Sequence, residues 1–215
     1  MKAMIILLSA LAISAQPAPS TEPQPPRTQT LPVFEREGLT PPWRAHDELT
    51  RDPHSQFPAF TLRDQSGAAF TKQSLDGKLV IANFMFIRCS QLCPILRASM
   101  QQVRESLHGD SNLLFVSHSV TPGGDSREEL AAYAQKNHIE GTWRIVTGAE
   151  RELDRVQHEG YLLPRPRTED GPAIHSELFV LLDRHQRVRG VYNGTLRLEL
   201  DLLARDVRAL EATDE

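Results

Sequence analysis

The sequence lacks an excess of positive charge, and it lacks an internal repeat. Its 215 residues include 24 lysines and arginines against 28 aspartates and glutamates, so the formal net charge is −4 and the pI is near 6.1. Nucleic-acid-binding proteins usually present a basic face, and this balance argues against that class of partner. Hydrophobic residues make up 40% of the chain, which is enough to form a core. The length fits one domain of ordinary size with extensions.

A long hydrophobic run is also missing. The apolar run near the N-terminus, residues 4–13, has about ten residues, short of the roughly 20 that a membrane-spanning helix needs. Lys2 precedes the run and the small residues Ser14 and Ala15 follow it, which is the pattern of a secretory signal peptide. We therefore expect a signal peptide over residues 1–15 and a periplasmic protein that meets a membrane only through a partner or an uncleaved signal segment. A buried N-terminal helix is the structural alternative.

The next segment, residues 16–55, is rich in proline and polar residues, as in QPAPSTEPQPPRTQTLPV. This composition cannot bury much apolar surface, which predicts a flexible tether. The folded domain is expected over residues 56–212.

The order of elements in this domain predicts its fold class. LVIANFMFI is a mostly apolar run of aromatic and β-branched residues, typical of a central strand that is buried on both faces. Strand–helix crossovers follow it, and an antiparallel hairpin and a helix close the chain. We therefore expect an α/β fold of the thioredoxin-like kind, with a mixed central sheet flanked by helices. Strands are expected in a hairpin over 60–71 and at 79–87, 112–120, 143–146, 177–183 and 187–194, and helices at 94–107, 126–137, 150–159 and 196–210.

Cysteine is scarce: Cys89 and Cys93 are the whole supply, three residues apart in FMFIRCSQLCPIL. Cys89 follows the predicted central strand, and Cys93 begins a predicted helix whose first turn holds Pro94. The partial positive charge at a helix N-terminus favours thiolate over thiol, and the charge of Arg88 would add to this effect. We therefore expect both thiols to be more reactive than the thiols of core cysteines.

Three interpretations of this pair are open. A structural disulfide would close a very short loop, which stabilises a fold by only about 2 kcal/mol in the entropy model. A redox pair is a stronger interpretation, although the best-known redox spacing has one residue fewer between the cysteines. A metal site is the third, because two thiolates on the first turn of a helix can face one point and are soft ligands suited to Cu(I).

A metal site would need a third ligand, and imidazole is the natural candidate. His118 lies in a strand expected beside the cysteine strand and is a weak candidate. His175 directly precedes a strand and follows a loop with glycine and proline that could fold over the cysteines. An ordinary loop histidine is the alternative for His175. The other six are interpreted as tether or solvated histidines: His46, His54, His108, His138, His158 and His185.

Three stretches, FMFIRCSQLCP, FVSHSVTPGGDS and IHSELFVLLDRHQRVRGVYNG, resemble the Sco/SenC family. The resemblance covers residues 56–210 and includes CxxxCP after an aromatic strand and one later histidine before a strand that ends in aspartate. It implies a thioredoxin-like fold, copper binding and a role in assembling the binuclear copper centre of cytochrome c oxidase. It further implies that Cys89, Cys93 and His175 are the copper ligands, and some members of the family act as thiol-disulfide reductases.

The sequence departs from the family pattern in three ways. Ser90 stands where many members have proline, and Thr121-Pro122 stands where the usual pair is aspartate-proline, while Asp125 keeps the later acidic position. Many members also carry a transmembrane anchor, whereas this chain has the pattern of a signal peptide. These departures spare the three implied ligands and concern the surface that meets the partner.

Together the residues and the resemblance favour a periplasmic copper-binding chaperone whose partner is a copper-receiving protein, in this family a cytochrome c oxidase subunit. The alternative is an enzyme, a thiol-disulfide oxidoreductase that uses Cys89 and Cys93 to keep a partner's metal-binding cysteines reduced, with a thiol reductant as a second partner. A peroxiredoxin-like peroxidase is a weaker interpretation, because Cys93 and His175 would have no clear role in it.

Overall fold

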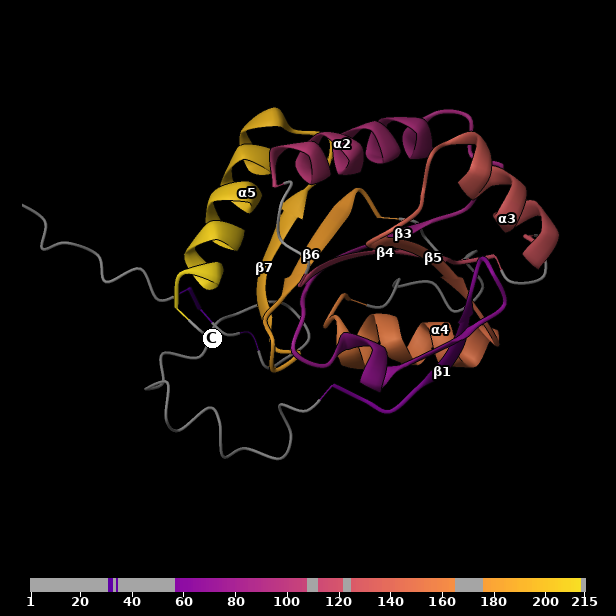
Figure 1. Ribbon diagram of the computed structural model, residues 1–215, viewed down its shortest axis with the longest axis horizontal. Coiled ribbons are helices and arrows are strands. Elements are labelled where there is room, and N and C mark those ends of the chain that lie inside the picture. Colours follow the sequence, from indigo (N-terminus) through magenta and orange to yellow (C-terminus); the bar gives the residue numbers. More distant parts are fainter. Residues whose placement is uncertain are drawn as a thin grey trace, which may run out of the picture.

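The computed structural model describes residues 31, 32, 34, 57–107, 112–121, 125–164 and 176–213. These residues form a mixed sheet of seven strands in the order β2-β1-β5-β4-β3-β6-β7, with helices on both faces (Figure 1). The strands are β1 (Thr61–Asp64), β2 (Ala69–Thr71), β3 (Leu79–Met85), β4 (Leu113–Ser119), β5 (Trp143–Thr147), β6 (Leu178–Leu182) and β7 (Val188–Asn193). The helices are α2 (Leu92–Ser106), α3 (Arg127–Lys136), α4 (Glu150–Arg155) and α5 (Arg197–Glu211).

The topology confirms the predicted fold class. β3, β4 and β5 run parallel and are joined through α2 and α3, which are the expected crossovers. β6 then returns antiparallel to β3, and β7 pairs antiparallel with β6. The hairpin of β1 and β2 adds to the other side of the sheet, antiparallel to β5.

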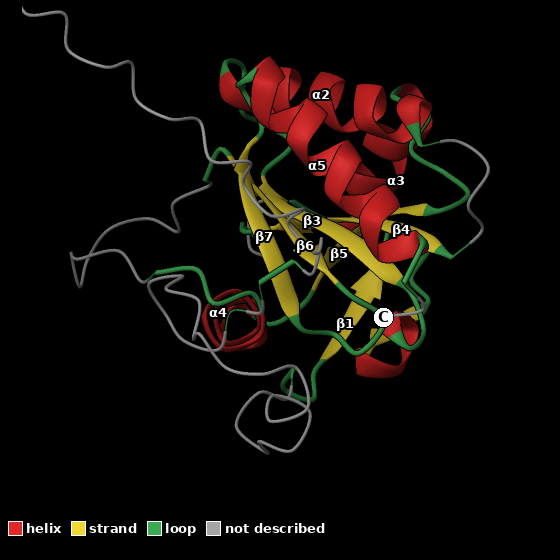
Figure 2. Ribbon diagram, turned by 90° about the vertical axis from the view of Figure 1, so that its left-hand side faces the viewer, coloured by secondary structure: helices red, strands yellow, loops and turns green. Residues whose placement is uncertain are grey.

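The core consists of two layers, one on each face of the sheet. All seven residues of β3 are buried, and because side chains alternate along a strand, Leu79 and Ile81 join one layer while Val80 and Phe84 join the other. The first layer lies under α2, α3 and α5, and the second lies over α4, as Figure 2 shows from the side. This two-sided burial explains why the β3 sequence is an almost continuous apolar run.

Several boundaries differ from the expectation. β3 ends at Met85 rather than at residue 87, because the Ile87 N–H bonds the Asp125 carboxylate instead of a neighbouring strand. α2 begins at Leu92, so Pro94 lies inside its first turn. The 3-10 turn at Lys72–Leu75 was not expected. The helix predicted over 150–159 is an α-helix only to Arg155 and continues as a π-helical turn at Val156–Gly160.

The expected signal peptide, residues 1–15, lies outside the described residues. Of the expected tether, 16–55, only Leu31, Pro32 and Phe34 are described, and both segments stay predictions. Within the described part of the chain, no helix has the length and apolar character to span a bilayer.

One edge of the sheet collects the ends of four strands. β3 and β4 both end there, since they are parallel, and the antiparallel β6 begins there with Phe179 opposite Asn83. β7 ends at the same edge, with Asn193 opposite Leu178. The chain leaves β3 at this edge toward both cysteines, and it is called the thiol edge below.

Candidate metal centre

Both cysteines lie at the thiol edge. Cys89 is in the loop that leaves β3, and Cys93 is the second residue of α2. Both are free thiols; Cys89 is partly exposed, whereas Cys93 is only 2% exposed. The prediction that the pair lies between a buried strand and a helix start is confirmed.

A sulfur atom caps the start of α2. The N-cap residue is Gln91, and its side chain makes no capping hydrogen bond. The Cys93 N–H donates instead to Cys89 Sγ, with 3.4 Å between nitrogen and sulfur. The first N–H groups of a helix have no acceptor within the helix, so the sulfur takes the place that a polar side chain often fills. This contact also holds the two cysteines on the same turn.

The surroundings of Cys89 favour its thiolate. Burial by itself would raise the pKa of this thiol, but hydrogen bonds with the backbone of Cys93, Gln91 and Leu92 and with the Cys93 side chain outweigh burial and lower the pKa below its ordinary value. Cys89 is therefore the more acidic and more accessible thiol of the pair.

The surroundings of Cys93 act in the opposite direction. Burial raises the pKa of the Cys93 thiol to about 11, and the charges of Cys89 and of the Asp125 carboxylate add to this effect. The expectation that both thiols are reactive is therefore wrong for Cys93. The helix start favours a thiolate there, but withdrawal from water costs more.

The Asp125 side chain holds the cysteine loop in place. Its side chain is buried, and Oδ2 accepts hydrogen bonds from the Ile87 N–H at 3.1 Å and from Ser119 Oγ at 2.9 Å. It thus ties the loop after β3 to the end of β4. The sequence marked Asp125 only as an acidic position shared with the family. Asp125 lies between the end of β4 and Ser126, the N-cap residue of α3, and this position indicates a structural role.

Two arginines take roles that the sequence did not predict. Arg88 forms an ion pair with Glu129 of α3 at 2.9 Å. Arg97, one turn after Cys93, interacts with Tyr133 of α3. Burial raises the pKa of the Tyr133 hydroxyl, Arg97 lowers it, and the charges of Cys93 and Cys89 raise it. Tyr133 is therefore a neighbour of the cysteine pair.

His118 is not a ligand. It lies in β4 directly beside Phe84 of β3, as the sequence predicted, but it belongs to the core. The ring stacks on Phe84 at 4.9 Å between centroids, and Nε2 contacts the Tyr161 hydroxyl at 3.0 Å. Burial lowers the pKa of His118 to about 3, so the imidazole is neutral.

The other described histidines are accounted for. His138 and His185 are exposed, in agreement with the prediction. His158 is buried, which the sequence did not predict: Nδ1 contacts the Leu163 carbonyl at 2.6 Å and Nε2 contacts Asp154 at 3.2 Å. The chain folds back over His158 after the π-helical turn, and periodicity alone gives no sign of such a return.

His175 lies outside the described residues. The strand that follows it, β6, begins at the thiol edge beside the end of β3. Within the described ranges no group of three or more histidine, cysteine, aspartate or glutamate side chains could hold a metal ion. The described part of the candidate site is thus a pair of free thiols, Cys89 in the loop before α2 and Cys93 on its first turn. Two such soft donors fit a soft cation such as Cu(I), and a third ligand would complete the site.

Comparison with known proteins shows one family over most of the chain. The family model described as SCO1/SenC matches residues 49–210. The SCO1 protein homolog of Bacillus subtilis (strain 168) is 26% identical over 155 residues, which cover 70% of this chain and 80% of that protein.

Solved structures share the fold. BsSco, described as a member of the Sco family of cytochrome c oxidase assembly proteins, has a TM-score of 0.63 at 24% identity, over 74% of this chain and 94% of the other. Copper-bound ScoI of Bradyrhizobium japonicum has a TM-score of 0.55 at 22% identity, over 72% of this chain and 99% of the other. The matched region includes the strands, the helices and both cysteines, and the chain therefore belongs to the SCO1/SenC family.

Proposed function

We propose that this protein is a periplasmic copper chaperone that serves assembly of the binuclear copper centre of cytochrome c oxidase. The observation that carries the proposal is the pair of free thiols at the start of α2, the partly exposed Cys89 in the preceding loop and the buried Cys93 on the first turn. Family membership supports the proposal, as do the related BsSco, described as an oxidase assembly protein, and the copper-bound ScoI.

Cys89, Cys93 and His175 would hold the copper. Cys89 has the lowered pKa and would bind first as a thiolate. Cys93 keeps its proton in the absence of metal, since its pKa is raised to about 11, and would release that proton when copper binds. Oxidation of both thiols to a disulfide would remove the two soft donors and release the metal.

Copper content tests this assignment. The purified, reduced full chain is loaded with copper, freed of excess metal and measured by elemental analysis, beside Cys89→Ser and His175→Ala. We expect one copper per chain in the unmodified protein and loss of bound copper in both variants. His185→Ala is the matched control, because His185 is exposed in the β6–β7 hairpin. Stoichiometric copper in both Cys89→Ser and His175→Ala would refute the ligand set.

A second function is favoured by the asymmetry of the thiols. In a thiol-disulfide reductase the accessible Cys89 thiolate attacks a partner's disulfide and forms a mixed disulfide, with one partner thiolate leaving. Cys93 then attacks the Cys89 sulfur, which releases the second partner thiol and leaves a Cys89–Cys93 disulfide. The partner gains two electrons, and an external thiol reductant restores the pair.

Trapping separates the two functions. A Cys93→Ser variant should accumulate the mixed disulfide on Cys89, detected by non-reducing electrophoresis, while Cys89→Ser should not. If His175→Ala keeps full activity in oxidase assembly while Cys93→Ser abolishes it, the reductase is the main function. If both variants lose activity, copper delivery is the main function.

A further inference from the structure

A short segment before the domain lies along the open side of β7. Leu31, Pro32 and Phe34 are described, and these three residues are called the strap here. The Phe34 N–H donates to the Val188 carbonyl at 2.9 Å, and the two residues form an antiparallel bridge. Because β7 is the last strand of the sheet, this bridge falls on an edge that would otherwise have unpaired backbone groups.

Two strap side chains pack against opposite faces of the sheet. Leu31 packs against the core layer under α2, α3 and α5, whereas Phe34 packs against the layer over α4. Residues three apart on an extended chain point to opposite faces, so this division is what a short edge strand would produce.

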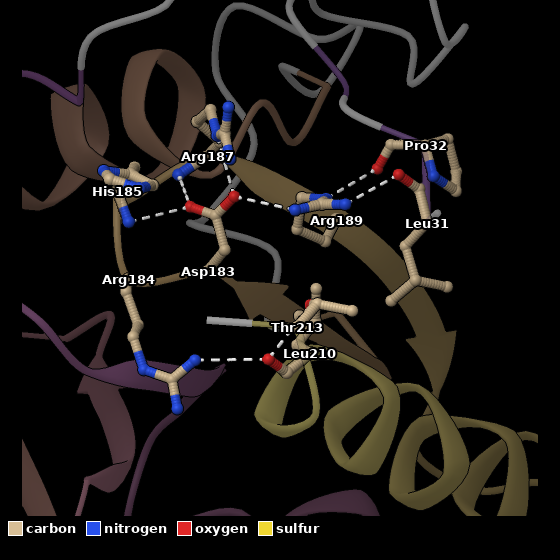
Figure 3. A network of polar contacts seen from close by, with 9 residues as sticks. All are labelled: Leu31, Pro32, Asp183, Arg184, His185, Arg187, Arg189, Leu210 and Thr213. Atoms are coloured by element: carbon tan, nitrogen blue, oxygen red, sulfur yellow. Dashed lines mark hydrogen bonds and ion pairs between the residues drawn. The ribbon is translucent and has the colours of Figure 1, made fainter. Parts of the chain in front are cut away.

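A buried charged cluster receives the strap backbone. Asp183 is fully buried, and its Oδ2 accepts from Arg187 Nε at 2.7 Å and from Arg189 Nη1 at 2.9 Å. Arg189, only 1% exposed, also donates from Nη2 to the Leu31 carbonyl at 2.7 Å and from Nε to the Pro32 carbonyl at 3.1 Å. Figure 3 shows its guanidinium between the Asp183 carboxylate and the two strap carbonyls.

The cluster explains residues that copper binding leaves without a role. The Asp183 carboxylate accepts from both guanidinium groups, and the strap carbonyls accept from Arg189. Charge-assisted hydrogen bonds of this kind are strong. Val188 pairs with Leu182, at the opposite end of the sheet from the thiol edge, so the cluster does not belong to the cysteine site.

We propose that the outer edge of β7, with Asp183, Arg187 and Arg189, is a docking surface for an extended chain segment, and that its occupant is this chain's own strap, docked in cis. Arg189 recognises two successive carbonyl groups, and Arg187 holds Asp183 in place beneath it. The docked strap keeps β7 from pairing with the β7 of a second copy, which is the usual hazard of an open edge strand.

Hydrogen exchange on the full chain tests the proposal. The amide of Phe34 should be protected in the unmodified protein, and Arg189→Met should make it exchange at least about tenfold faster, because two anchors of the strap are lost. Arg184→Met is the matched control: Arg184 lies in the same hairpin but donates to the Leu210 carbonyl, and strap exchange should not change.

A second variant distinguishes release of the strap from unfolding of the whole domain. Phe34→Ala leaves the buried cluster intact and removes the ring that packs on the core, so exchange of its own amide should rise while the amides of β3 and β4 stay protected. The proposal fails if residue 34 is unprotected in the unmodified chain, or if Arg189→Met and Phe34→Ala both leave its exchange unchanged. Protection that falls on about tenfold dilution would overturn docking in cis, because the strap of a second copy would then be the occupant.

Discussion

At the scale of single residues, Cys89 and Cys93 are in contact at the start of α2 but have different environments. Hydrogen bonds at the helix start stabilise the Cys89 thiolate, whereas burial and the neighbouring Asp125 carboxylate disfavour a thiolate at Cys93. The pair therefore has one thiol, Cys89, that favours the reactive thiolate and one, Cys93, that favours the protonated form. This difference suits both metal binding and disulfide exchange.

Alkylation should distinguish the two thiols. With limiting iodoacetamide at neutral pH, we expect Cys89 to be modified first, because only thiolates react and Cys93 is both protonated and buried. Peptide mass mapping gives the site of modification, and Cys93→Ser should react at nearly the same rate as the unmodified protein. Equal labelling of both cysteines would contradict the assigned asymmetry.

The pH dependence of stability should report on Cys93. Its pKa is about 11 in the folded protein and 9.0 without the fold, so the folded state holds the proton more tightly. The resulting stabilisation is complete below pH 9.0 and is lost as the pH rises toward 11. Between pH 9 and about 10, before tyrosines of the unfolded chain titrate, the free energy of unfolding should fall.

Denaturant titrations at successive pH values measure this slope. Cys93→Ser has no titrating thiol at this position and should show a flatter dependence in the same window. An identical slope in both proteins would mean that Cys93 is not the group responsible.

The cysteine pair shows how far sequence reasoning reaches at this scale. Spacing and the strand–helix boundary predicted where Cys89 and Cys93 lie. They did not predict that Cys93 is buried or that it interacts with Asp125 and Tyr133, which follow much later in the chain. His158 escaped prediction for the same reason, since its acceptor, the Leu163 carbonyl, comes from a turn without periodic pattern.

At the scale of elements, the loop between β3 and α2 is held by a side chain from outside both. Asp125 precedes α3, yet its carboxylate accepts from Ile87 in the loop and from Ser119 at the end of β4. The start of α3 is itself fixed by a capping box between Ser126 and Glu129. The cysteine loop is thus held in place by Asp125 from the connection between β4 and α3.

Removal of this carboxylate should loosen the loop. Asp125→Ala leaves the Ile87 N–H and the Ser119 hydroxyl without their acceptor, at a cost of about 1–3 kcal/mol in the free energy of unfolding. Asp125→Asn keeps one oxygen acceptor and should cost less, while it lowers the pKa of Cys93 by removing a negative charge. Chemical denaturation and thiol titration measure the two effects, and an unchanged unfolding midpoint in Asp125→Ala would contradict this role.

Element prediction succeeded where a pattern is local. β3 and α5 carry long apolar runs or stripes, and their positions agree with the structure to within about two residues. The 3-10 turn at Lys72–Leu75 and the π-helical turn after α4 have no periodic apolar pattern. They are set by packing between elements, which a single sequence does not display.

At the scale of the whole molecule, the mixed sheet brings distant parts of the chain to the thiol edge. Gly194 follows β7, and a Cβ atom there would lie 2.8 Å from Leu96 of α2 and 2.8 Å from the Phe179 ring of β6. The turn between β7 and α5 therefore packs against α2 and β6 with no room for a side chain at Gly194.

Substitution of this glycine should be costly. Gly194→Ala should destabilise the protein by about 1–3 kcal/mol, because the methyl group must displace Leu96 or Phe179. In a Leu96→Ala background the same change should cost less, since part of the obstruction is gone. Thermal unfolding of the single and double variants measures this coupling, and strictly additive effects would show that the contact with Leu96 is not the cause.

The fold class was predictable because parallel crossovers and a terminal hairpin leave clear marks in the order of elements. The contact of residues 31–34 with β7 was not, because the proline-rich composition around them has no strand pattern and Arg189 is separated from them by most of the chain. Which side chains meet at the thiol edge likewise depends on strand order, and strand order emerges only when the sheet assembles.

The last turn of α5 has a practical consequence for studies of partner binding. Arg184, in the β6–β7 hairpin, donates to the Leu210 carbonyl at 3.2 Å, which fixes the end of α5 at the sheet end remote from the cysteines. Immobilisation on a sensor surface through a C-terminal tag should therefore leave Cys89 facing the solution, free to meet a soluble copper donor or acceptor.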